Sequence, residues 1–308
     1  MGKNDESKKL FWEDDERFAD LINILFGQGE EIVSAADLRK SSETLHMGKI
    51  DGTAKEIQKY RDVIREAVVD GTLLFLIGIE NQEMTHYAMP ARVMLLDALG
   101  YEQQLRERQN VHKKANDLKP GAEFLSGLTA GEQLMPVCTV TLYYGKEPWD
   151  GPRDLHGLLR LENVPEKLRR TIPNYPITLV EVHSFPDWEK FRTDLREVFG
   201  FIQCSEDKEK LEDFLKQNEE RFRVLSEDTK DFLAYTTGIK NLPEIKNEEG
   251  NHDMCKAIDD MIKEGVEKKL KQLIKKKLAK GKSVEVIADE LDEEREVIEK
   301  LIAEMKTE

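Results

Sequence analysis

The chain has 308 residues, of which 39% are hydrophobic and 35% are charged. Its longest apolar run, residues 73–79, is far shorter than the roughly 18 residues that a membrane-spanning helix needs. The polar N-terminus has no signal-peptide pattern, and the three scattered cysteines have no CxxC pair, which excludes a disulfide framework and a cysteine zinc site. We therefore expect a globular, soluble protein that resides in the cytoplasm and has no membrane partner.

The formal net charge is −15, which argues against a protein that coats nucleic acid by bulk electrostatics. The charge is unevenly distributed, because residues 262–282 contain nine lysines and two glutamates. This block is either the solvated face of a helix or a contact for nucleic acid or another acidic partner. Under the second interpretation, substrate-binding residues include Lys275, Lys276 and Lys277.

The first predicted element is an amphipathic helix over residues 13–27. Phe18, Leu21 and Ile22 recur at helical spacing, acids occupy the first turn, and glycines follow the last turn. Asp20 lies beside the apolar face of this helix. Residues 34–54 are polar and mixed, which predicts a loop or an irregular link.

Two strands are predicted in residues 60–82, joined by the hairpin dipeptide Asp70-Gly71. Asp62 lies in the first strand, and Glu80 and Gln82 end the second. After His86 the apolar residues recur three and four apart, which predicts a long helix with Pro90 in an early turn.

Further strands are predicted over residues 134–145 and 176–185, and the chain is almost wholly helical after residue 187. This order predicts an α/β core over residues 1–205 and an α-helical C-terminal region over residues 206–308. The tail has the pattern of a small helix-turn-helix with Val284, Ile287, Ala288 and Leu291 on one face and Val297, Leu301 and Ile302 on the next. The acidic second helix favours an interaction or dimerisation element over a DNA reader, and the assembly we expect from dimerisation is a homodimer through the C-terminal helices.

The polar residues at the end of the second strand suggest a metal site. Alternation along a strand directs Glu80 and Gln82 to the same face, and the hairpin brings Asp62 alongside. Oxygen donors of this kind suit Mg²⁺, which accepts few protein ligands and can activate a water for attack on a phosphodiester. The alternative interpretation is a polar exit from a buried strand with Asp62 facing solvent.

The runs RFADLINILF, KYRDVIREAVVDGTLLFLIGIENQ, HYAMPARVMLLDAL and LMPVCTVTLYYGKEPWDGPRDLH together resemble the recombination-promoting nuclease (Rpn) group, also described as transposases, of the PD-(D/E)xK nuclease superfamily. The similarity covers most of residues 13–205, and NHDMCKAIDDMI near residue 251 resembles the C-terminal extension of that group. The resemblance implies a restriction-endonuclease-like core, in which a central mixed sheet is flanked by helices. It also implies a DNA endonuclease that depends on Mg²⁺, with Mn²⁺ as a substitute, and that is connected with recombination, mobile elements or defence against foreign DNA.

The resemblance assigns a role to each candidate site residue. Asp62 and Glu80 would be the metal ligands, and Asp20 would complete the catalytic set. Gln82 stands where the wider superfamily has a lysine, and an amide can orient the attacking water without supplying positive charge.

Arg92 follows these residues on the next predicted helix. It would contact a substrate phosphate or pack along the helix surface. The missing lysine and the net charge of −15 keep a second hypothesis open, namely an inactive nuclease relative that binds nucleic acid or proteins as a scaffold.

Overall fold

The computed structural model describes residues 3–41, 44–47, 57–60, 62–69, 72–239, 270–271, 273–278, 282–291 and 294–307. The chain divides into two compact units. The first unit comprises Met1–Phe214 and Asp231–Gly238, and the second comprises Leu215–Lys230 and Ile239–Glu308. The candidate strand end lies in the first unit.

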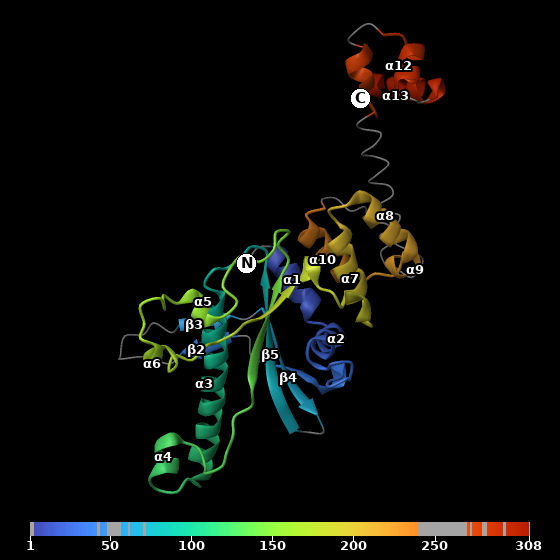
Figure 1. Cartoon of the computed structure of the whole chain (residues 1–308). Helices are drawn as coiled ribbons and strands as arrows, with labels where there is room; N and C mark the ends of the chain where they lie inside the picture. Colours follow the sequence, from blue (N-terminus) through green and yellow to red (C-terminus); the bar gives the residue numbers. More distant parts are fainter. Residues whose placement is uncertain are drawn as a thin grey trace. The chain divides into compact units, whose positions relative to one another are not determined.

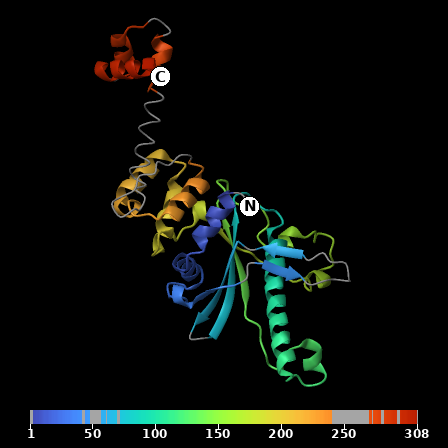
Figure 2. The ribbon, with the colours of Figure 1, turned by 180° about the vertical axis from the view of Figure 1, so that it is seen from behind.

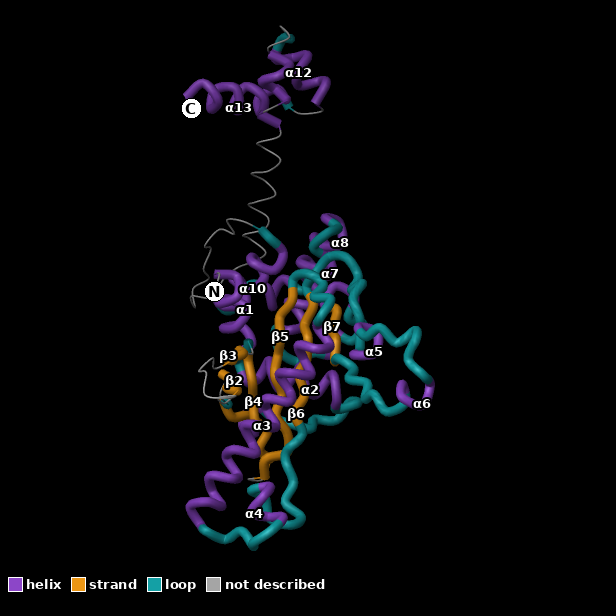
Figure 3. The backbone as a smooth tube through the Cα atoms, turned by 90° about the vertical axis from the view of Figure 1, so that its left-hand side faces the viewer, coloured by secondary structure: helices purple, strands orange, loops and turns teal. Residues whose placement is uncertain are grey.

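A five-stranded mixed sheet with the order β1-β4-β5-β6-β7 forms the centre of the first unit. Its strands are β1 (Leu38–Lys40), β4 (Val63–Val69), β5 (Thr72–Gln82), β6 (Val137–Tyr143) and β7 (Thr178–Glu181). The first three strands pair antiparallel, whereas β5, β6 and β7 pair parallel. Figure 3 shows β4, β5, β6 and β7 side by side in this order. A separate hairpin consists of β2 (Thr44–Met47) and β3 (Ile57–Tyr60), and β2 contacts α3.

Helices cover the sheet on both sides, so the molecule has a helix–sheet–helix arrangement in this unit. Figures 1 and 2 show α3 (Met89–Ala115) on one side of β4 and β5, and α2 (Asp15–Phe26) with α1 (Lys3–Trp12) on the other. Because both faces of the sheet are covered, β4 and β6 are buried along almost their whole length. The prediction of an α/β fold with a mixed sheet flanked by helices is therefore confirmed.

Two buried arginines attach α2 to its surroundings. Arg65, in the middle of β4, donates to the carboxylate of Asp15 at 2.5 Å and to the carbonyl oxygen of Glu13 at 2.6 Å. Arg17, on α2, forms a two-bond ion pair with Asp194, at 2.8 and 2.9 Å. Both guanidinium groups therefore donate to oxygen atoms inside the protein, and these hydrogen bonds offset the desolvation cost of burying their charge.

Most of the predicted elements are confirmed. The helix at 13–27 is α2, which Asp14 caps by accepting from the backbone N–H of Arg17. The long helix is α3, with Pro90 in its first turn, and the predicted strands correspond to β4, β5, β6 and β7. The turn at residues 70–71 lies outside the described residues.

The prediction of an irregular link over residues 34–54 is wrong in part. A 3₁₀ turn (Ala35–Asp37), β1 and β2 lie within this range. β1 has only three residues and exposes two of them, so it leaves no periodic pattern in the sequence. Its position is determined by pairing with β4, where Leu38 lies opposite Ala67.

The other described helices are short in most cases. They are α4 (Ala122–Ser126), α5 (Leu155–Leu158), α6 (Glu166–Arg169), α7 (Leu195–Cys204), α8 (Lys208–Gln217), α9 (Glu219–Phe222), α10 (Glu227–Thr237), α12 (Val284–Leu291) and α13 (Arg295–Thr307). Among the described helices, none is long and apolar enough to cross a membrane.

The C-terminal helices have a small core of their own. Ile274, Ile287, Ala288, Ile298 and Leu301 are buried together, which confirms the predicted apolar face of the first tail helix. On α13 the prediction for Val297 is wrong, because this residue is 39% exposed and Ile298 occupies the core instead. Ile298 is separated from Leu301 and Ile302 by three and four positions, so the three side chains share one helix face.

His112 at the end of α3 lies between two carboxylates of the segment that follows the helix, Asp117 and Glu132. His112, in the last turn of α3, contacts Asp117 through Nδ1 at 2.8 Å and Glu132 through Nε2 at 2.9 Å. These hydrogen bonds, that of Glu132 first, raise the pKa of His112 and favour the imidazolium form. The same contact lowers the pKa of Glu132.

The pH dependence of stability is expected to reveal this contact. Because the pKa of His112 is raised in the folded state, its contribution is fully present below the unfolded pKa of about 6.5 and is lost as pH rises through the folded pKa. The urea midpoints of wild type and His112→Gln should therefore differ more at about pH 6 than at about pH 9. A difference that is constant across this range would contradict the ionic role of His112.

Candidate functional site

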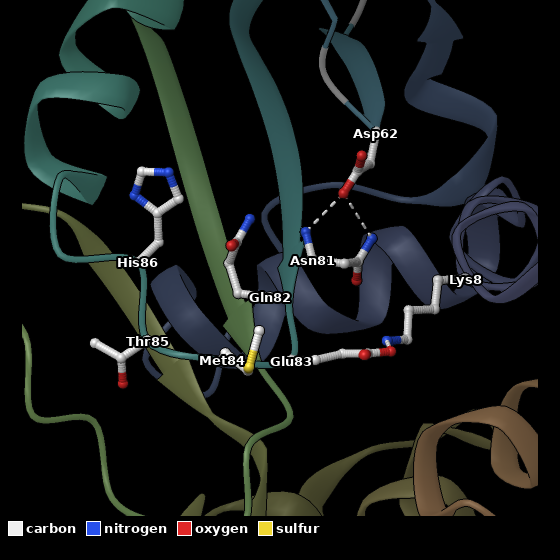
Figure 4. Close-up of a pocket in the computed structure, with 8 residues that line it drawn as sticks. All are labelled: Lys8, Asp62, Asn81, Gln82, Glu83, Met84, Thr85 and His86. Carbon is white, nitrogen blue, oxygen red and sulfur yellow. Dashed lines mark hydrogen bonds and ion pairs between the residues drawn. The ribbon is translucent and has the colours of Figure 1, made fainter. Parts of the chain in front are cut away.

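The candidate site lies at the C-terminal end of β5, where a pocket of about 300 Å³ opens. Eight residues line it: Lys8, Asp62, Asn81, Gln82, Glu83, Met84, Thr85 and His86. Figure 4 shows Gln82 and His86 on one side of β5, and Asn81, Asp62 and Lys8 on the other. The strand thus delivers polar groups to both of its faces at one point, as alternation along a strand requires.

Asp62 lies at a bend one residue before β4, and its carboxylate is oriented by Asn81. Oδ2 of Asp62 accepts from the backbone N–H of Asn81 at 2.7 Å and from its side-chain Nδ2 at 3.2 Å. β4 begins at Val63, which pairs with Ile79, so Asp62 lies outside the paired residues of the two strands. Figure 4 shows Asp62 on the same side of β5 as Asn81, with Gln82 on the other side. Because Glu80 shares the face of Gln82, the structure does not bring the Asp62 carboxylate to the face of Glu80 and Gln82 as the sequence suggested.

A chain of hydrogen bonds continues from Asn81 into the core. The hydroxyl of Tyr144 donates to Oδ1 of Asn81 at 3.0 Å and accepts from Nε1 of Trp12 at 2.9 Å. Burial raises the pKa of Tyr144, so its hydroxyl keeps its proton and remains a donor. The amide of Asn81 is thereby fixed with its nitrogen toward Asp62 and its oxygen toward Tyr144.

Glu80 has a different partner. Its side chain is fully buried, and Oε2 accepts from Nε and Nη2 of Arg92 at 2.9 and 2.7 Å. Arg92 lies in the first turn of α3 and is 36% exposed. In this structure the guanidinium of Arg92 is therefore directed to Glu80.

Asp20 does not join Asp62 in the pocket. Its Oδ2 accepts three hydrogen bonds of 2.8 Å, from the backbone N–H groups of Arg192 and Thr193 and from the hydroxyl of Thr193. The side chain is buried and holds the segment that leads into α7. The structure thus gives Asp20 a structural role and leaves the predicted catalytic role without geometric support.

The lysines of the C-terminal unit differ from one another. Lys275 and Lys276 are exposed, whereas Lys277 donates to Glu290 at 2.5 Å. Lys282 contacts the other oxygen of the same carboxylate, and hydrogen bonds from the two lysines lower the pKa of Glu290 to about 2. Lys277 therefore belongs to the internal packing of the C-terminal helices.

A divalent metal ion requires oxygen ligands that converge on one point. Mg²⁺ accepts one or two carboxylates and leaves its other positions to water and substrate, so the carboxylate of Asp62 is a ligand of the right type. Glu80 is not a lining residue of the pocket and is paired with Arg92 on the other face of β5, so the two acids do not form one ligand set in this structure. Within the described ranges, no group of three or more His, Cys, Asp or Glu side chains is placed to hold a metal ion. His86 offers a further polar atom, since its Nδ1 is buried with no hydrogen-bond partner among the described residues.

Sequence reasoning missed several residues of this site, among them Lys8, Asn81 and Tyr144. Lys8, Asn81 and Tyr144 reach it from α1, β5 and the end of β6. The position of Asn81 between Glu80 and Gln82 was a usable signal, because its side chain had to face the opposite side of the strand. Lys8 and Tyr144 left no comparable signal, because only the tertiary structure brings them to the pocket.

No family model, curated protein or solved structure matches this chain. The function is therefore argued from the geometry and chemistry of the pocket.

The ion pair between Arg92 and Glu80 is expected to stabilise the fold. Arg92→Met leaves a buried carboxylate without its cation, and we expect a loss of about 2 kcal/mol, less than for a fully buried pair because Arg92 is 36% exposed. Urea denaturation measures this loss, and adding Glu80→Gln to Arg92→Met should recover part of it. Arg106→Met, on the same helix, removes an exposed pair with Glu102 and should cost less than about 0.5 kcal/mol. Equal losses in both arginine variants would contradict this assignment.

Proposed function

We propose that this protein is a DNA endonuclease that depends on a divalent metal ion, with a restriction-endonuclease-like core. One observation carries the proposal, namely that Asn81 holds the carboxylate of Asp62 in a polar pocket at the end of β5. The mixed sheet flanked by helices agrees with the fold that the resemblance implies. Asp62 would hold Mg²⁺ or Mn²⁺, and Glu80 would become the second ligand if it leaves Arg92 and turns to the side of Asp62. The ion would polarise the phosphodiester and acidify a bound water.

The protein's own side chains have separate tasks in this proposal. Asn81 orients the carboxylate of Asp62 by hydrogen bonding. Arg92 neutralises the charge of Glu80 as long as no metal ion binds this carboxylate. Gln82 and His86 lie together on one side of β5, where an amide and an imidazole can orient a water by hydrogen bonding (Figure 4). Lys275 and Lys276 remain proposed contacts for the DNA backbone, and association through the C-terminal helices remains a proposal.

A second candidate function is favoured by the buried ion pair. Glu80 is fully enclosed and paired with Arg92, which is also the arrangement expected of a structural salt bridge. In that case the protein is a nuclease relative without catalysis that binds nucleic acid or other proteins. The response to metal ions distinguishes the two functions.

Cleavage of supercoiled plasmid tests the proposed activity. Wild type should nick and linearise the plasmid with Mg²⁺ or Mn²⁺ and should stop when EDTA is added. Asp62→Asn and Glu80→Gln should each slow cleavage by about 100-fold or more, because each removes a charged ligand from the reacting centre. Glu162→Gln changes an exposed acid of the same unit and should leave the rate unchanged.

Thermal unfolding supplies a second measurement that does not require activity. Millimolar Mg²⁺ or Mn²⁺ should raise the Tm of wild type and of Glu162→Gln, but not that of Asp62→Asn or Glu80→Gln. Intact plasmid together with no metal response in wild type would reject the nuclease and favour the binding protein.

A further inference from the structure

Lys8 is an unusual component of the pocket, because it is a lysine whose side chain is only 4% exposed. Lysine is almost never fully buried unless its ammonium group is paired. Lys8 lies on α1, whose last two residues, Phe11 and Trp12, are completely buried. These aromatic residues anchor α1 against the protein and bring Lys8 to the end of β5.

Two contacts stabilise the ammonium group of Lys8. Nζ donates to Oε1 of Glu83, and it also lies 5.1 Å from the ring centroid of Tyr144. The second contact is a cation–π interaction, which is favourable for a cation that has lost part of its hydration. Glu83 is 53% exposed, so water competes for this ion pair and the ammonium can exchange Glu83 for another anion.

The ammonium group of Lys8 lies on the same side of β5 as Asp62 (Figure 4). Lys8 contacts the ring of Tyr144, whose hydroxyl donates to Asn81, and Asn81 donates to Asp62. Figure 4 shows Lys8 and Asp62 on the same side of β5, with Gln82 on the opposite side. Gln82 carries no charge, and Arg92 donates to Glu80. Of the eight residues that line this pocket, Lys8 is the only lysine or arginine.

We propose that Lys8 is a catalytic residue of this site, and that its ammonium group contacts a non-bridging oxygen of the phosphodiester. The inference rests on the proposed nuclease function and adds a positive charge that Gln82 lacks. In the reaction, a water oxygen bonds to phosphorus while the bond to the leaving oxygen breaks. The water loses a proton, and the leaving oxygen gains one. Lys8 exchanges no proton and stabilises the negative charge that accumulates on the phosphate oxygens in the transition state.

Paired substitutions separate this role from a structural one. Lys8→Gln and Glu83→Gln break the same ion pair, but only Lys8→Gln removes the cation. We expect Lys8→Gln to lower the single-turnover rate of plasmid cleavage by about 100-fold, with the metal-induced rise in Tm retained. Glu83→Gln should stay within about threefold of wild type, and Lys8→Arg should restore part of the rate. Lys40→Gln, which changes an exposed lysine of the same unit, serves as the control for charge.

Each outcome decides the inference. If Lys8→Gln cleaves the plasmid at the wild-type rate while Asp62→Asn is inactive, the proposed role of Lys8 is overturned and the proposed nuclease function stands. If Lys8→Gln and Glu83→Gln lose equal amounts of cleavage rate and of Tm, the ion pair serves folding, and the proposed catalytic role of Lys8 is overturned. If Lys8→Gln does not fold, Lys8→Arg and Glu83→Gln decide, because the proposal requires both to cleave. Inactive wild type that shows no metal response would overturn the proposed function and this inference together.

Discussion

The pairing of β4 with β5 is the constraint on which the candidate site depends. Near the turn Val69 lies opposite Thr72, but an irregularity at Ala67 and Val68 adds one residue to β5, so that Val63 lies opposite Ile79. Because side chains alternate along a strand, this β-bulge shifts which residues of β4 and β5 share a face at the strand end. Asp62 itself lies at a bend before β4, and its hydrogen bonds with Asn81 direct its carboxylate to the Asn81 face of β5.

Packing around this hairpin determines which cations reach the strand end. Arg65 ties β4 to the start of α2, while Phe11 and Trp12 bury the end of α1. Lys8 consequently approaches β5 from α1, and Arg92 approaches it from α3. Glu83 and Glu80 are therefore each paired with a basic residue from a different helix, and both pairs depend on the helix–sheet packing.

The parts of the fold that were predictable are those with a local pattern. α2, α3 and the long strands were evident from periodicity, because one residue in three or four, or a continuous apolar run, faces the core. β1 was missed because three largely exposed residues carry no period. Asp62, Glu80 and Gln82 were predicted as site residues because they lie at the end of a predicted strand. The ion pair of Arg92 with Glu80 was not predicted, since the sequence around an arginine does not indicate which carboxylate it will contact. The burial of Lys8 likewise depends on aromatic packing that the polar sequence around it does not suggest.

The net charge of −15 does not decide whether this pocket accepts an anionic substrate. At about 0.1 M ionic strength, charges more than about 10 Å apart are largely screened, so the nearest groups determine the field at the strand end. Those groups include two cations, Lys8 and Arg92, each held by one carboxylate in the structure. A divalent ion at Glu80 would compete with Arg92, and a phosphate in the pocket would compete with Glu83 for Lys8. Binding of metal and of phosphate would then each replace an existing ion pair, so the local charge favours the two ligands together more than either one alone.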